Sequence, residues 1–112
     1  MSELSRINAS LRIEAIKTAL RNRPGLLDLM LNEAKDDINL KSTPEKLDCD
    51  EPDDILVRAA WDIWNGSGDT EFCKVLDSLP MEDYEALLDA LKKFGELRQR
   101  IYFAYASGEE ND

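Results

Sequence analysis

Hydrophobic residues along this chain recur every three or four positions, and no segment alternates polar and apolar residues as a half-buried strand does. The pattern predicts helices within residues 3–22, 25–38, 52–65, 70–78 and 81–105. Thr43 before Pro44 and Glu45 has the form of a helix cap and predicts one further helical turn. The expected fold is therefore all-α, a compact bundle of four or five helices with a long C-terminal helix.

The apolar stripes predict which helical faces are buried. The first helix has two stripes on nearly opposite sides, so it either breaks near residues 8–10 or is covered on two sides. The broad stripe of residues 25–38 predicts a central helix built on Leu27, Met30, Leu31, Ala34 and Ile38. In residues 70–78 and just beyond, the side chains expected to face the core are Phe72, Val75, Leu76 and Leu79. The last helix is expected to bury a seam of Tyr84, Leu87, Leu88, Leu91, Phe94, Ile101, Tyr102 and Tyr105.

Size and composition are typical of one globular domain. The 112 residues are 43% hydrophobic and 34% charged, which is sufficient for a real core. We expect a single helical domain over residues 1–106, with an acidic loop at about 39–54, and a disordered acidic tail over 107–112. The start has no apolar leader, and no run approaches the roughly 18 apolar residues of a membrane span. The expectation is a cytoplasmic protein that does not contact membrane.

Cysteine and histidine usage argues against a metal site. The chain has no histidine, and Cys49 and Cys73 are far apart in the sequence, so zinc ligation is not expected. Two isolated cysteines fit a reducing compartment, although one disulfide bond between them stays open. We expect no cofactor and no metal.

The glycine-rich segment 65–72, "NGSGDTEF", raises the question of a calcium or phosphate loop. Neither register of an EF-hand places oxygen ligands and glycine correctly, and the acids at 69 and 71 would repel phosphate. The segment is instead predicted to be a bend between two helices. Asn65 or Gly66 would adopt the left-handed conformation, and Ser67 or Asp69 would cap the next helix.

Catalytic constellations are missing from the sequence. Without histidine the commonest general base is absent, and no Ser or Cys has a visible base partner. Neighbouring carboxylates such as Asp53 and Asp54 point to different faces of a helix and make no ready acid–base pair. An enzyme is therefore the least favoured of three functional classes.

Negative charge is the most pronounced feature of the composition. The formal charge is −10, and five of the seven residues from 48 to 54 are acidic, more than capping one helix requires. Trp61 and Asp62 follow closely, with Trp61 either an exposed anchor for a partner or packed under the neighbouring loop. The residues predicted to bind a partner are Asp48, Asp50, Glu51, Asp53, Asp54, Trp61 and Asp62.

The first functional hypothesis follows from this charge. The chain is expected to be an acidic protein-binding module, an inhibitor or modulator that occupies a basic surface of a partner, including one that normally holds nucleic acid. It would not bind nucleic acid directly.

Self-association is the alternative hypothesis. Ile101, Tyr102, Phe103 and Tyr105 occupy more than one face at the end of a long helix, so the first helix or a second copy of the chain must cover them. A homodimer is slightly favoured, and it would make the protein a structural or assembly adaptor or chaperone.

Overall fold

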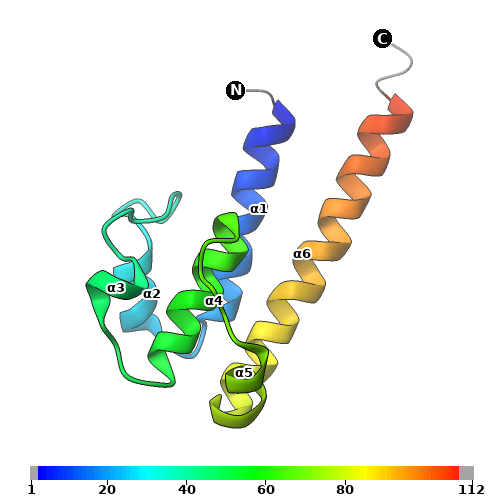
Figure 1. Ribbon diagram of the computed structural model, residues 1–112. Coiled ribbons are helices and arrows are strands. Elements are labelled where there is room, and N and C mark those ends of the chain that lie inside the picture. Colours follow the sequence, from blue (N-terminus) through cyan, green and yellow to red (C-terminus); the bar gives the residue numbers. More distant parts are fainter. Residues whose placement is uncertain (1–2, 109–112) are drawn as a thin grey trace.

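The computed structural model describes residues 3–108 and confirms the all-α fold (Figure 1). No strand occurs within this range, which holds only an isolated bridge between Leu31 and Ile38. The six helices are α1 (Glu3–Ala19), α2 (Pro24–Met30), α3 (Pro44–Leu47), α4 (Asp53–Asn65), α5 (Phe72–Ser78) and α6 (Met81–Gly108). The first two residues of the expected tail continue α6, and residues 109–112 lie outside the described range.

Two long helices form the axis of the bundle. In Figure 1, α1 and α6 run in opposite directions, and α1 packs against both α6 and α4. Coverage by two helices of the same chain explains the two apolar stripes of α1, which continues without a break through residues 8–10. The first turns of α1 and the last turns of α6 extend beyond α4, giving overall dimensions of 51 × 28 × 21 Å.

The core lies where α1, α2, α4 and the first half of α6 meet. Its largest fully buried apolar side chains are Ile16, Leu20, Met30, Leu31, Leu56 and Val57. Ala86 and Ala90 are also fully buried, so the first half of α6 presents small residues to its neighbours. The contacts of these alanines with the core fix the position of α6, so the opposite face of this helix is directed away from the core.

Residues 25–38 do not form the single helix that was predicted. The helix α2 ends at Met30, and Lys35 adopts a left-handed conformation with φ of 59°. The side-chain oxygen of Asn32 accepts hydrogen bonds from the backbone N–H groups of Asp36 (3.0 Å) and Asp37 (3.3 Å). This local side-chain competition for backbone donors favours a turn over continued helix.

The short helix α3 forms as predicted. The side chain of Thr43 accepts a hydrogen bond from the backbone N–H of Lys46, and Pro44 occupies the first helical turn. Residues 39–43 lead into α3, and Ser42 of this segment contacts Trp61 of α4. The helix α3 also contacts α4, which packs in addition against α1 and α2.

Candidate functional site

Three of the five acids in the predicted binding cluster form ion pairs within the chain. Glu51 pairs with Lys74 at 3.3 Å, Asp53 with Arg23 at 3.4 Å, and Asp54 with Arg58 at 2.9 Å. In the described range, only the other two form no ion pair. They are Asp48, which ends α3 in a left-handed conformation, and Asp50. These three pairs link α4 and its neighbours, and the cations reduce the repulsion among the acids.

Trp61 is not an exposed anchor. Its side chain is 5% exposed, and its Nε1–H donates a hydrogen bond of 2.7 Å to the backbone carbonyl of Ser42. The alternative expectation, that Trp61 packs under the neighbouring loop, is confirmed. The reason is that the 39–43 segment folds over α4 and supplies a backbone acceptor for the indole.

Asp62 organises the glycine-rich bend. Its carboxylate accepts hydrogen bonds from the backbone N–H groups of Gly68 (2.8 Å) and Thr70 (2.9 Å). Gly66 adopts the predicted left-handed conformation, with φ of 80°, and ends α4. The prediction that Ser67 or Asp69 caps α5 is wrong, because Glu71 occupies the N-cap position without a side-chain cap bond. Instead, Asp62, which lies in the preceding helix α4, accepts the hydrogen bonds of these backbone N–H groups.

The protonation of Asp62 should therefore be coupled to folding. Burial acts to raise the pKa of Asp62, but its hydrogen bonds with the Thr70 side chain and with the backbone of residues 68–70 outweigh burial and leave the pKa below its ordinary value. A carboxyl with a depressed native pKa stabilises the fold above its unfolded pKa, about 3.9, and this stability is lost as pH falls through the lower native pKa.

We expect Asp62→Asn to lower the free energy of unfolding by about 1–2 kcal/mol at pH 7, because one charge-assisted bond is replaced by a repulsive N–H contact. The difference from the parent chain should begin to shrink below about pH 4, where the carboxyl of the unfolded parent chain becomes protonated, and it should be lost below the lower native pKa. Urea unfolding between neutral and acidic pH measures it, with the exposed Asp69→Asn as control. A difference that does not change with pH would contradict this role for the charge.

A cluster of exposed hydrophobic side chains lies on the opposite side of α6 from its buried alanines. Phe72 is 81% exposed and Leu76 67%, although both were predicted to face the core. Leu88 and Leu91, expected in the buried seam of α6, are each 48% exposed. The prediction failed because α5 has only two turns, and the face bearing Val75 and Leu79 is the one that reaches the core.

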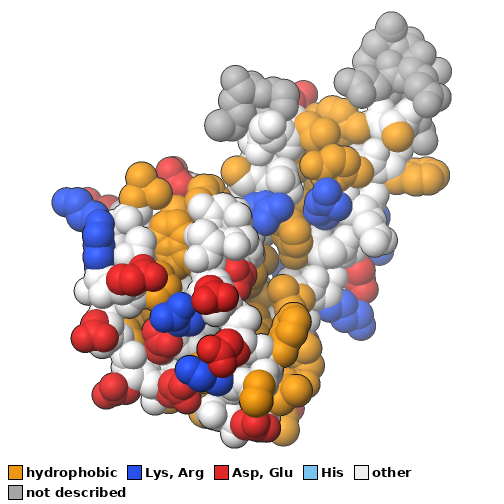
Figure 2. Space-filling model, in the orientation of Figure 1, with side chains coloured by type: hydrophobic (Ala, Val, Ile, Leu, Met, Phe, Trp, Pro, Cys, Tyr) orange, Lys and Arg blue, Asp and Glu red, His pale blue; other side chains and the backbone are white. Residues whose placement is uncertain are grey.

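These side chains border one groove. Its volume is about 450 Å³, and residues of α4, α5 and α6 line it. Ala59, Ile63, Val75 and Leu87 are its buried members, and Tyr84 is partly buried. Figure 2 shows the hydrophobic side chains gathered at the lower right, where α5 lies against α6. We call this feature the α5–α6 groove.

Acidic residues lie close in sequence to the residues that line the α5–α6 groove. The stretch of chain that contains the lining residues, 59–91, has eight acidic residues and one basic residue, so it carries −7 of the chain's formal −10. Asp83 and Asp89 form ion pairs with arginines, and the Asp62 carboxylate accepts hydrogen bonds from the backbone of the bend. In the described part of the chain, the remaining five are exposed and form no ion pair: Asp69, Glu71, Asp77, Glu82 and Glu85.

The residues predicted for self-association occupy the distal part of α6. Ile101 and Tyr105 are half-buried, Tyr102 is 37% exposed and Phe103 is 75% exposed. The guanidinium of Arg98 lies over the Tyr102 ring, 4.3 Å from its centroid. A shallow hollow of about 360 Å³ separates Tyr102 from α1 and from Trp64 of α4. The first helix thus covers this region only in part.

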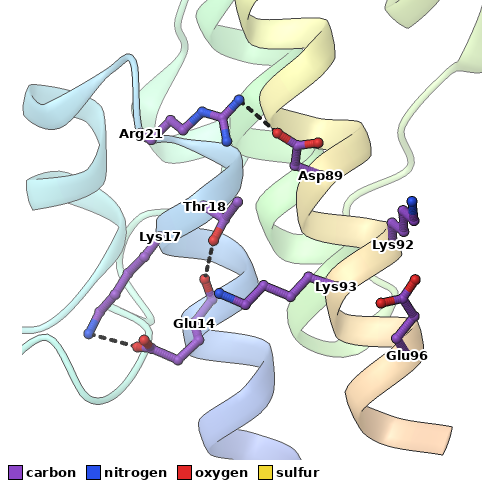
Figure 3. A pocket seen from close by; sticks show the side chains of 8 residues that line it. All are labelled: Glu14, Lys17, Thr18, Arg21, Asp89, Lys92, Lys93 and Glu96. Atoms are coloured by element: carbon purple, nitrogen blue, oxygen red, sulfur yellow. Dashed lines mark hydrogen bonds and ion pairs between the residues drawn. The ribbon is translucent and has the colours of Figure 1, made fainter.

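A second hollow, between α1 and α6, carries mixed charge. Lys17 pairs with Glu14 at 3.0 Å and Arg21 with Asp89 at 2.8 Å. Figure 3 shows both pairs. Lys92, Lys93 and Glu96 complete an open surface of about 570 Å³. Because charges of both signs alternate there and are solvated, the surface has the character of an ordinary helix–helix boundary rather than an anion site.

The cysteines show no activation. Both are free thiols. Burial and then the carboxylates of Asp53 and Asp54 raise the pKa of the Cys49 thiol, and the hydrogen bond with Asp77 raises the pKa of the Cys73 thiol. A nucleophilic cysteine needs the opposite shift.

Residues 3–108 contain no group of three or more acidic or cysteine side chains placed to hold a metal ion. Over the same residues, no helix has the length and apolar character that crossing a membrane requires. Comparisons with protein-family models, curated proteins and solved structures found no significant match to this chain.

Proposed function

We propose that the chain is a non-enzymatic, acidic protein-binding module that modulates or inhibits a partner by occupying a basic surface on it. The observation that carries the proposal is the α5–α6 groove, an apolar concavity with four large exposed side chains at its borders. Contiguous apolar surface that is exposed on a protein often marks a site where another protein binds. We therefore propose the groove as the binding site, whereas the sequence alone suggested the acidic segment 48–54.

The energetics of the groove suit protein binding. Full burial of a Leu or Phe side chain contributes about 1.5–3 kcal/mol, so covering these partly exposed side chains supplies a useful share of that value at each position. The exposed acids that are close in sequence to the lining residues would act mainly on the rate of encounter and on partner choice. Together they favour a partner that is apolar at its centre and basic at its edges.

The proposed function is tested with a displayed library of random peptides, from which clones that bind the immobilised chain are selected. Replacing Leu76 by Glu should weaken the selected binders by at least about tenfold, roughly 1.4 kcal/mol, since it places a charge in the groove. Leu40→Glu is the matched control, because Leu40 is 72% exposed and lies outside the groove, whereas Leu76 is 67% exposed. Binders that tolerate both substitutions equally, or a library without binders, would reject the groove as the binding site.

A second candidate is the self-associating adaptor. The exposed Phe103 and the hollow beside Tyr102 favour it, because both remain uncovered at the end of α6. The charge of −10 opposes it, since two copies would bring like charges together. For that reason the acidic module is the leading proposal.

A further inference from the structure

We infer that the α5–α6 groove receives an amphipathic α-helix of another protein, with its apolar stripe in the groove and Lys or Arg on its flanks. The inference rests on the proposed function and adds the conformation and charge of the partner segment.

The walls of the groove indicate why the occupant should be helical. The groove is lined by residues of α4, α5, α6 and the bend between α4 and α5. Helical walls use their own backbone hydrogen bonds, and residues 3–108 contain no strand whose edge could pair with an extended peptide. The only charged side chain in the lining, Asp62, already accepts bonds from the bend. The lining therefore offers few polar groups to an occupant, and a helix suits such a groove because it satisfies its own backbone groups.

The spacing of the lining residues matches a helix face. Tyr84, Leu87, Leu88 and Leu91 lie at positions i, i+3, i+4 and i+7 of α6, and they cover about 10 Å at 1.5 Å per residue. Phe72, Val75 and Leu76 repeat the i, i+3, i+4 spacing on α5. A partner helix lying in the groove would present the same pattern over about two to three turns.

The acidic residues of this chain favour basic residues on the flanks of the partner helix. The five exposed acids without ion pairs, defined above, lie within the same stretch of chain as the lining residues. A basic helix would provide them with counter-charges, whereas a second copy of this chain would bring its own acids against them. The occupant is accordingly a basic segment of a different protein.

The test uses three fluorescent synthetic peptides of about 18 residues, or about five helical turns. The first is an amphipathic Leu/Lys helix, the second replaces every Lys by Glu, and the third is the Leu/Lys peptide interrupted by two central prolines. Fluorescence anisotropy measures affinity, and circular dichroism measures the helicity gained on binding. The Leu/Lys helix should bind and gain helicity, and the other two should bind at least about tenfold more weakly.

Variants of the chain separate groove binding from general attraction. Leu76→Glu and Leu88→Glu should each weaken the Leu/Lys helix at least about tenfold, whereas Leu40→Glu should not. All three variants add one negative charge, so general attraction to a basic peptide would strengthen binding in each of them. Thermal unfolding of each variant serves as the control for folding, and all three should remain folded because the substituted positions are exposed.

Each outcome decides a separate point. If the proline-interrupted peptide or the Glu peptide binds as tightly as the Leu/Lys helix, the helical or the basic character of the occupant is refuted, and the groove can remain a binding site. If the parent chain sediments as a dimer that Leu76→Glu dissociates, the occupant is a second copy and the inference is wrong. If Leu76→Glu affects neither these peptides nor the selected library binders, the proposed function fails as well.

Discussion

Replacing Arg23 by Met is expected to reduce the free energy of unfolding by about 3 kcal/mol, because it leaves a fully buried carboxylate without its cation. Asp83 is 0% exposed, and its Oδ2 lies 2.7 Å from Nη2 of Arg23. The same guanidinium lies 3.4 Å from Asp53 of α4, so it joins the α1–α2 turn to α4 and α6. Arg23 is partly exposed, which places the expected loss at the lower end of the range for buried pairs.

A double-mutant cycle with Asp83→Asn tests the electrostatic origin of this loss. In the parent chain, Asp83→Asn should destabilise by about 1–2 kcal/mol, since it removes charge-assisted bonds. In the Arg23→Met background the same substitution should stabilise, because it removes an uncompensated buried charge. Urea unfolding of the four proteins at pH 7 gives the coupling energy. Additive losses would show that Arg23 acts by packing alone.

The sequence predicted helix class better than helix extent. The ends at Asn65 and Gly66, and the start at Thr43 and Pro44, follow from local conformational preferences and were placed closely. The break after Met30 was missed, since the apolar spacing of residues 25–38 continues through it and keeps Met30, Leu31 and Ile38 buried. Burial alone does not distinguish one helix from a helix followed by a turn. The side-chain bonds of Asn32 make that choice.

The acidic cluster shows a different limit. Five acids in seven residues exceed what helix capping needs, and this excess suggested an external basic partner. The structure accounts for three of them through Lys74, Arg23 and Arg58. Two of these cations are at least 20 residues away in sequence, so spacing along one helix could reveal only the pair of Asp54 with Arg58.

The groove was hidden by the same pattern that predicted the helices. An apolar stripe indicates that a surface is covered, but it does not say whether the chain itself or a partner covers it. The sequence did contain one sign of the groove, because α6 has more apolar residues than its core face needs. Ala86, Leu87 and Ala90 face the core, and Leu88 and Leu91 extend the apolar surface beyond that face. A short α5 cannot cover them, as its own Phe72 and Leu76 are exposed.

The position of α5 depends on the bend that precedes it, and the bend depends on Gly68. Gly68 is buried against α4. Its N–H donates a hydrogen bond to the Asp62 carboxylate, and its carbonyl accepts one of 3.3 Å from Arg58. A Cβ added to Gly68 would lie 1.7 Å from the backbone oxygen of Arg58 and 2.9 Å from the backbone nitrogen of Asp62. Neither atom belongs to a flexible side chain, so the bend itself would have to move.

We therefore expect Gly68→Ala to lower the free energy of unfolding by about 3 kcal/mol, through overpacking and weakened bonds to Asp62. The matched control is Gly95→Ala, the same substitution at a helical position where an added Cβ meets nothing within 4 Å. It should stabilise by up to about 1 kcal/mol, because Ala favours helix over Gly. Since Thr70 lies in the bend, Phe72 begins α5 and both line the groove, any folded Gly68→Ala protein should also bind the Leu/Lys helix more weakly than the Gly95→Ala protein does. Equal stability of the two variants in urea would mean that the bend relaxes freely, and that its packing against α4 does not fix the groove.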